Sequence, residues 1–158
     1  MTPILQVKNL QTHFFTKAGV LKAVDGVSFE IGAGEIVGLV GESGSGKSIT
    51  GFSILGLVDA PGRIVGGQIL FKGRDMTSIP PAEMQKLRGS RIAMIFQDPM
   101  MTLNPVLRIE TQMIESILTH DSSISKEEAR QRSRDTLGLV GISSPEERMR
   151  AYPHQFSG

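Results

Sequence analysis

One short segment of the sequence brings together residues that could hold phosphate groups. It reads GESGSGKS, with glycines at positions 41, 44 and 46 followed by Lys47 and Ser48. Glycine can adopt positive φ and has no Cβ, so backbone N–H groups can approach an anion closely. A lysine and a hydroxyl directly after such a loop supply a positive charge and a magnesium ligand. The segment therefore predicts a phosphate-binding site.

A glycine-rich loop of this kind could also arise by chance, but the neighbouring sequence argues against this. The apolar run 36–40 precedes the loop, and a helical apolar pattern runs from Lys47 to about Val58. This order places the positive end of a helix at the phosphates. Kinases, GTPases, helicases and transporter ATPases share the pattern, so it predicts nucleoside triphosphate binding and leaves the class open.

The elements around this loop can be predicted from hydrophobic patterning. Residues 4–31 predict β structure, and the alternation in VSFEI (27–31) is typical of a half-buried strand. The apolar runs 36–40 and 91–96 do not alternate, so we expect strands buried on both faces of a parallel sheet. A shorter strand is expected at 68–73.

The C-terminal part of the sequence predicts helices. A short helix is expected at 80–89, entered through prolines. Ser125 and Ser144 each begin a capping-box pattern ahead of a later helix. The change in composition near residue 100 predicts two domains: residues 1–99 with the β structure and the phosphate loop, and residues 100–158, which are helical.

Composition and charge narrow the class of protein. The 158 residues are 39% hydrophobic and 21% charged, which is typical of a globular chain. The net charge of +1 gives no reason to expect a nucleic-acid partner. Cysteine is absent, which excludes disulfides and thiolate metal sites. There is neither a signal-peptide pattern nor an apolar run near the roughly 20 residues that span a bilayer, so we expect a cytoplasmic protein.

Two further segments resemble motifs of one family. In RIAMIFQDP, Gln97 follows an apolar run, as in the Q-loop of ATP-binding-cassette (ABC) ATPases. YPHQFSG (152–158) resembles the approach to their signature motif and its first three residues, with Phe156 in place of the usual leucine. The chain thus resembles an ABC transporter ATP-binding subunit of the dipeptide or oligopeptide importer type. The resemblance implies an α/β P-loop NTPase fold, an ABC-type nucleotide-binding domain with an incomplete core sheet, an antiparallel β subdomain and a helical subdomain.

The resemblance also assigns roles to residues. It implies ATP and Mg²⁺ as cofactors, bound by the loop and the helix start: Gly41, Glu42, Ser43, Gly44, Ser45, Gly46, Lys47, Ser48, Ile49 and Thr50. Ser48 and Gln97 would ligate the metal, and Gln97 would approach the attacking water as the catalytic residue. Phe14 would stack on adenine, with Phe15 as the second candidate and core packing as the alternative for either.

The end of the sequence departs from the family pattern. Ser157 and Gly158 would contact the γ-phosphate held by a second subunit, but the signature motif stops there. The acidic pair and the switch histidine that follow in the family have no counterpart. We therefore expect a C-terminal truncation that binds nucleotide weakly and does not hydrolyse it.

The function implied is the energising of peptide import, or import of related small solutes, across the cytoplasmic membrane. Expected partners are membrane permease subunits, a second ATP-binding subunit in a homo- or heterodimer and, indirectly, an extracytoplasmic solute-binding protein. The chain would be peripheral on the inner face of the membrane. Alternatives are an ABC system for nickel or another solute, a cytosolic ABC ATPase of DNA repair or translation, and a non-catalytic remnant module.

Overall fold

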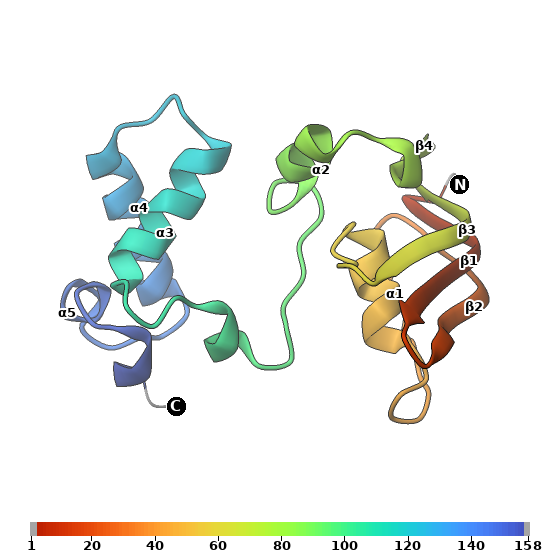
Figure 1. Ribbon diagram of the computed structural model, residues 1–158. Helices are drawn as coiled ribbons and strands as arrows, with labels where there is room; N and C mark the ends of the chain where they lie inside the picture. Colours follow the sequence, from red (N-terminus) through yellow and green to blue (C-terminus); the bar gives the residue numbers. More distant parts are fainter. Residues whose placement is uncertain (1–2, 157–158) are drawn as a thin grey trace. The chain divides into compact units, whose positions relative to one another are not determined.

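The structure is a computed structural model that describes residues 3–156, apart from the side chains of residues 99 and 101. The chain forms two compact units, Met1–Ala93 and Met94–Gly158 (Figure 1). The boundary expected from the sequence, between residues 99 and 100, lies inside the second unit. Among residues 3–156, no helix is both long and apolar enough to cross a bilayer.

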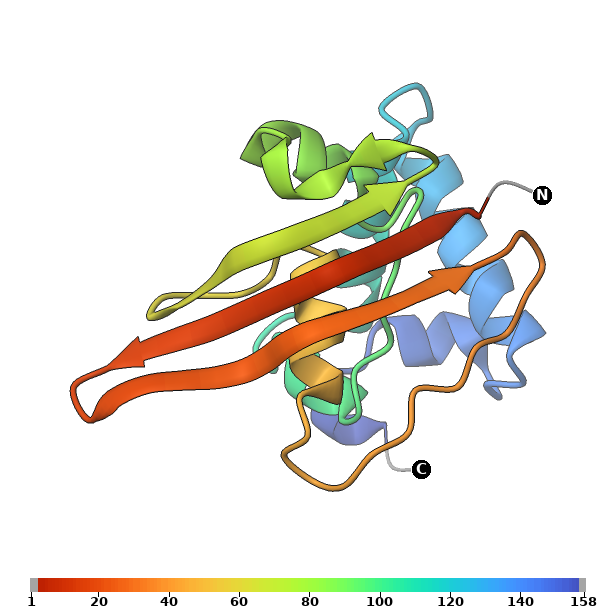
Figure 2. The ribbon, with the colours of Figure 1, turned by 90° about the vertical axis from the view of Figure 1, so that its right-hand side faces the viewer.

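The first unit is built on an antiparallel sheet with the strand order β2-β1-β3-β4 (Figure 2). Its strands are β1 (Leu5–Thr16), β2 (Gly19–Ile31), β3 (Gly62–Phe71) and β4 (Arg74–Asp75). The alternation predicted in VSFEI is confirmed, because Val27, Phe29 and Ile31 are partly buried while the polar residues between them are exposed. β3 begins at Gly62, earlier than the pattern at 68–73 predicted.

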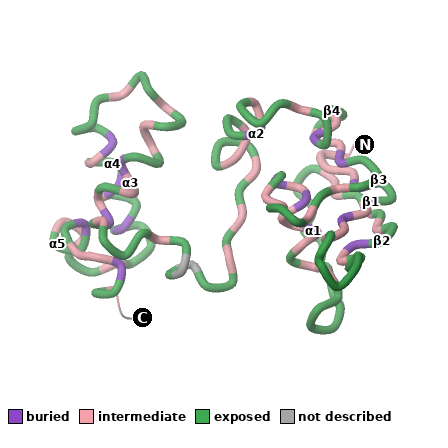
Figure 3. Tube along the Cα trace, in the orientation of Figure 1, coloured by how far each residue is buried: buried purple, intermediate pink, exposed green. Residues whose placement is uncertain are grey.

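One face of this sheet is covered by helix α1 (Lys47–Ile54), as Figure 2 shows. The 3-10 helix η1 (Met76–Ser78) and helix α2 (Pro81–Leu87) complete the unit. Its buried core consists of Val7, Leu10, Val24, Ile69, Met76 and Met84; buried positions are purple in Figure 3. Full burial of one such side chain contributes about 1.5–3 kcal/mol. Ile49 and Ile54 of α1 pack against this cluster, which holds the helix on the sheet.

The two strands expected at 36–40 and 91–96 are not formed, which corrects the sequence-based prediction. Ile36, Val40 and Ile95 are 98%, 91% and 92% exposed. A strand is stable only beside another strand, and the ladders found among the described residues all belong to β1–β4. The apolar runs therefore have the composition of buried strands without the neighbours that would bury them.

Helix α1 also ends earlier than predicted, at Ile54 instead of Val58. Gly56 has φ +59°, a left-handed conformation that stops a helix and that glycine adopts without strain. The predicted helix at 80–89 is confirmed as α2.

The second unit is helical. It contains η2 (Pro99–Thr102), α3 (Ile109–His120), α4 (Lys126–Leu139), α5 (Pro145–Met149) and η3 (Pro153–Gln155). The cap predicted for α4 is confirmed, because the Glu128 N–H donates to Ser125 Oγ at 3.1 Å. The cap predicted for α5 is wrong. Ser144 has φ +51° and makes no side-chain cap bond, since a capping serine needs extended backbone.

Candidate nucleotide-binding site

Lys47 closes the glycine-rich loop onto the start of α1. Its Nζ donates to the carbonyl oxygens of Gly41 and Glu42, both at 2.7 Å, and more weakly to Ser45 Oγ at 3.3 Å. The two backbone bonds fix the first half of the loop and leave the ammonium at its centre. An ammonium has three donors, so the long contact to Ser45 is the one that a phosphate oxygen can replace.

At Gly46 the loop lies in direct contact with strand β2. It is the N-cap of α1 with φ +89°. A Cβ built on it would lie 2.2 Å from the carbonyl oxygen of Ala23, a distance that no side chain tolerates. Glycine is therefore required both for the backbone conformation and for the close approach. Sequence reasoning missed Ala23, because an alanine in a strand carries no signal for this contact.

The first turn of α1 separates supporting side chains from accessible ones. Thr50 is buried, and its hydroxyl donates to the Gly46 carbonyl at 3.0 Å. Ile49 is half-buried and packs against the core cluster. Ser48 is exposed beside Lys47 at the start of the helix. Of the predicted hydroxyls in this turn, that of Ser48 is the accessible one, and an oxygen donor is what Mg²⁺ prefers.

The remaining loop residues, Glu42, Ser43, Gly44 and Ser45, are exposed. Gly44 has φ +81°, so the loop turns there through a conformation that favours glycine. A glycine-lined turn, a central ammonium and an exposed hydroxyl at a helix start together fit a magnesium–nucleotide complex. When bound, Mg²⁺ neutralises phosphate charge.

The two phenylalanines of β1 lie in different surroundings. Phe14 is half-buried opposite Leu21 of β2 and Gly62 of β3, and a Cβ on Gly62 would stand 2.6 Å from its ring. Phe15 is 38% exposed, with the guanidinium of Arg63 lying 4.2 Å from its ring centroid. Arg63 thus already occupies a face of Phe15 by a cation–π contact.

The predicted site residues of the second unit are placed only in part. Gln97 is exposed, just before η2, whose start is capped by Asp98 through the Met100 N–H at 3.1 Å. Ser157 and Gly158 lie outside the described residues. Before them, the Tyr152 N–H donates to Gln155 Oε1 at 2.8 Å.

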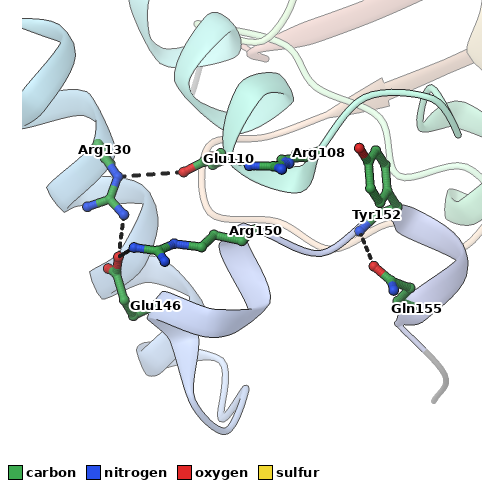
Figure 4. A network of polar contacts seen from close by, with 7 residues as sticks. All are labelled: Arg108, Glu110, Arg130, Glu146, Arg150, Tyr152 and Gln155. Carbon is green, nitrogen blue, oxygen red and sulfur yellow. Dashed lines mark hydrogen bonds and ion pairs between the residues drawn. The ribbon is translucent and has the colours of Figure 1, made fainter.

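An ion-pair network joins α3, α4 and α5 in the second unit (Figure 4). Arg130 of α4 pairs with Glu110 of α3 at 3.6 Å and hydrogen-bonds Glu146 of α5. Arg150 adds a contact to Glu146 at 3.3 Å. The hydrogen bond from Arg130, with its positive charge, holds the pKa of Glu146 below its ordinary value. The Ile109 N–H donates to the Ala151 carbonyl at 3.0 Å, which fixes the end of α5 to α3.

Comparison with known proteins defines the family. The ABC transporter family pattern matches residues 24–158, and the chain belongs to this family. It is similar to the oligopeptide transport ATP-binding protein AppD of Bacillus subtilis (strain 168), with 49% identity over all of this chain and 48% of the relative. It is also similar to the dipeptide transport ATP-binding protein DppD of Escherichia coli (strain K12), with 44% identity over 98% of this chain and 47% of the relative. The chain thus spans about half the length of these curated relatives.

Solved structures show the fold. The dimeric structure of MJ0796, described as a bacterial ABC transporter cassette, matches with a TM-score of 0.82 and 24% identity, covering 98% of this chain and 63% of that one. Its ADP- and phosphate-bound post-hydrolysis form matches with a TM-score of 0.80 and 22% identity, over 97% and 63%. The predicted fold class is confirmed: this is the α/β fold of an ABC cassette with an antiparallel sheet.

Proposed function

We propose that the chain binds Mg-ATP at residues 41–50 and is part of the ATP-binding subunit of a peptide importer. The observation that carries this proposal is the Lys47 ammonium at the centre of a loop held by the Gly41 and Glu42 carbonyls. There it is placed to contact the β- and γ-phosphates, while the exposed Ser48 hydroxyl ligates the metal. Phe14 takes the adenine ring, as the family resemblance implies, with Phe15 as the second candidate.

Hydrolysis needs groups that orient and activate water, and positioning is most of the catalysis in phosphoryl transfer. We assign Gln97 to the metal and the attacking water. The 158 residues contain no Asp-Glu pair of the kind that polarises this water in the family. On their own they therefore bind nucleotide weakly and release no phosphate. In the working subunit, Ser157 and Gly158 contact the γ-phosphate bound to a second subunit.

Peptide transport is supported by the relatives, which are oligopeptide and dipeptide transport ATP-binding proteins. On this proposal the partners are a second ATP-binding subunit, membrane permease subunits and, through them, a solute-binding protein. The subunit is then peripheral on the cytoplasmic face of the membrane, held there by the permease.

Calorimetric titration with Mg-ATP tests the proposed site. Lys47→Ala should weaken binding roughly tenfold to a hundredfold, the value of a charge-assisted hydrogen bond. Lys86→Ala, on the exposed side of α2, is the matched control and should bind as the parent does. Equal affinity of Lys47→Ala and the parent would refute the site, as would a parent that binds no nucleotide. Phosphate release by the parent chain would refute the expectation of no hydrolysis.

A further inference from the structure

Arg88 holds the far end of the phosphate-binding helix. It follows α2 directly, and its Nε donates to the Leu55 carbonyl at 2.7 Å while its Nη2 donates to the Gly56 carbonyl at 2.6 Å. These carbonyls lie just past the end of α1, where a helix leaves acceptors unpaired and carries partial negative charge. A planar guanidinium contacting both restrains the position of α1 far more than one flexible contact would.

The backbone around Arg88 forms a tight turn that ends at Ile92. Leu87 accepts hydrogen bonds from the N–H groups of Arg91 at 2.9 Å and Ile92 at 3.1 Å, and the Gly89 N–H donates to the Ile92 carbonyl at 2.9 Å. Arg88 and Ile92 also form an isolated parallel bridge. Arg88, which hydrogen-bonds the residues just after α1, thus lies in this turn. The turn ends at Ile92, and Gln97 follows five residues later.

We infer that Arg88 is a positioning residue that ties α1 to the segment leading to Gln97. This inference rests on the proposed function. α1 is eight residues long, a stiff rod of about 12 Å with the phosphate loop at one end and Arg88 at the other. A shift of Lys47 on phosphate binding moves the Leu55 and Gly56 carbonyls, and the guanidinium carries that shift to the turn at 87–92. Arg88 touches no nucleotide and acts through α1.

Amide hydrogen exchange without nucleotide tests whether Arg88 ties the turn at 87–92 to α1. In Arg88→Ala, the amides of Gly89 and Ile92 should exchange roughly tenfold faster or more, the effect of losing hydrogen bonds to a charged donor. Arg88→Lys should restore part of the protection. Arg74→Ala removes an exposed arginine that also contacts α2, through Glu83, and should leave both amides unchanged. Unchanged exchange in Arg88→Ala would overturn the inference, as would an equal rise at the core strands β1 and β3, which would indicate global destabilisation.

Exchange measured with Mg-ATP tests the relay, meaning the transmission of a shift from α1 through Arg88 to the turn at 87–92. An arginine with a purely structural role would not transmit such a shift. In the parent, nucleotide should slow exchange at Leu57, whose N–H donates to the Phe52 carbonyl of α1 at 2.8 Å. It should slow exchange to the same extent at Gly89 and Ile92. In Arg88→Ala, nucleotide should still slow Leu57 but no longer the two turn amides. If the turn amides of Arg88→Ala still respond as in the parent, the relay is wrong although ATP binds. A parent that fails to bind Mg-ATP in calorimetry would overturn the proposed function and the relay together. The comparison without nucleotide would still decide whether Arg88 ties α1 to the turn at 87–92.

Discussion

The hydroxyls of Thr12 and Ser53 lie 2.8 Å apart in the buried interface between β1 and α1. Ser53 Oγ also donates to the Ile49 carbonyl at 2.7 Å, so in this arrangement it accepts from Thr12. The pair joins the sheet to the helix that carries Lys47. A polar contact in this position fixes the register of α1 on the sheet, which apolar packing alone would leave less specific.

This pair predicts an asymmetric response to mutation. Ser53→Ala should cost about 1–3 kcal/mol of unfolding free energy, because the Thr12 hydroxyl stays buried without this acceptor. The double change Thr12→Val with Ser53→Ala should cost less than Ser53→Ala alone, since both polar groups are gone. Urea unfolding of the single and double variants measures the coupling. Strictly additive effects would show that the hydroxyls do not interact.

The unformed strands predict a contrast among three isoleucines. Ile36→Ala and Ile95→Ala should each change stability by less than about 0.5 kcal/mol, because both side chains are almost fully exposed. Ile69→Ala, in the buried cluster, should cost about 2–5 kcal/mol. The measurement is the free energy of unfolding in urea. A loss at Ile36 or Ile95 as large as at Ile69 would mean that these runs are buried in solution.

Ser125 and Ser144 both precede a helix of the second unit, but the same substitution should have different outcomes at the two positions. Ser125→Ala should cost about 1 kcal/mol, because it removes the acceptor for the Glu128 N–H. Ser144→Ala should cost much less, since Ser144 makes no cap bond. Thermal unfolding followed by helical circular dichroism compares them. Equal losses would indicate that Ser144 caps α5 after all.

The ion-pair network predicts how the stability of the folded chain depends on pH. The pKa of Glu146 is lowered in the folded chain from an ordinary value of 4.5 by the hydrogen bond and charge of Arg130. The stability that the ionised Glu146 side chain contributes is therefore fully present above pH 4.5, and it is lost as the pH falls through the lowered pKa of the folded state. Glu146→Gln should flatten the acid decline of the melting temperature between pH 6 and 3, whereas Glu115→Gln, exposed on α3, should not. Parallel curves for the parent and Glu146→Gln would contradict this.

Features that depend on a few neighbouring residues were predictable from sequence. The turn in the glycine-rich loop is an example, because it needs only a positive φ at Gly44, whereas phosphate binding by this loop and Lys47 stays a prediction. The alternation in VSFEI and the Ser125 cap were predicted correctly for the same reason, since strand periodicity and helix capping act within a few residues. The roles of Gln97 and Phe14 came from family resemblance and stay predictions, as do those of Ser157 and Gly158.

Features that depend on residues distant in sequence were decided only by tertiary structure. The runs 36–40 and 91–96 read as buried strands, yet strand formation requires a neighbouring strand, which a segment's own composition does not supply. Likewise, no local sequence pattern predicts that Ala23 contacts Gly46 or that Arg88 hydrogen-bonds Leu55. The sequence by itself determined the chemistry of the loop, because that chemistry resides in adjacent residues. The tertiary structure determined what holds the loop in place, because those contacts join segments that only folding brings together.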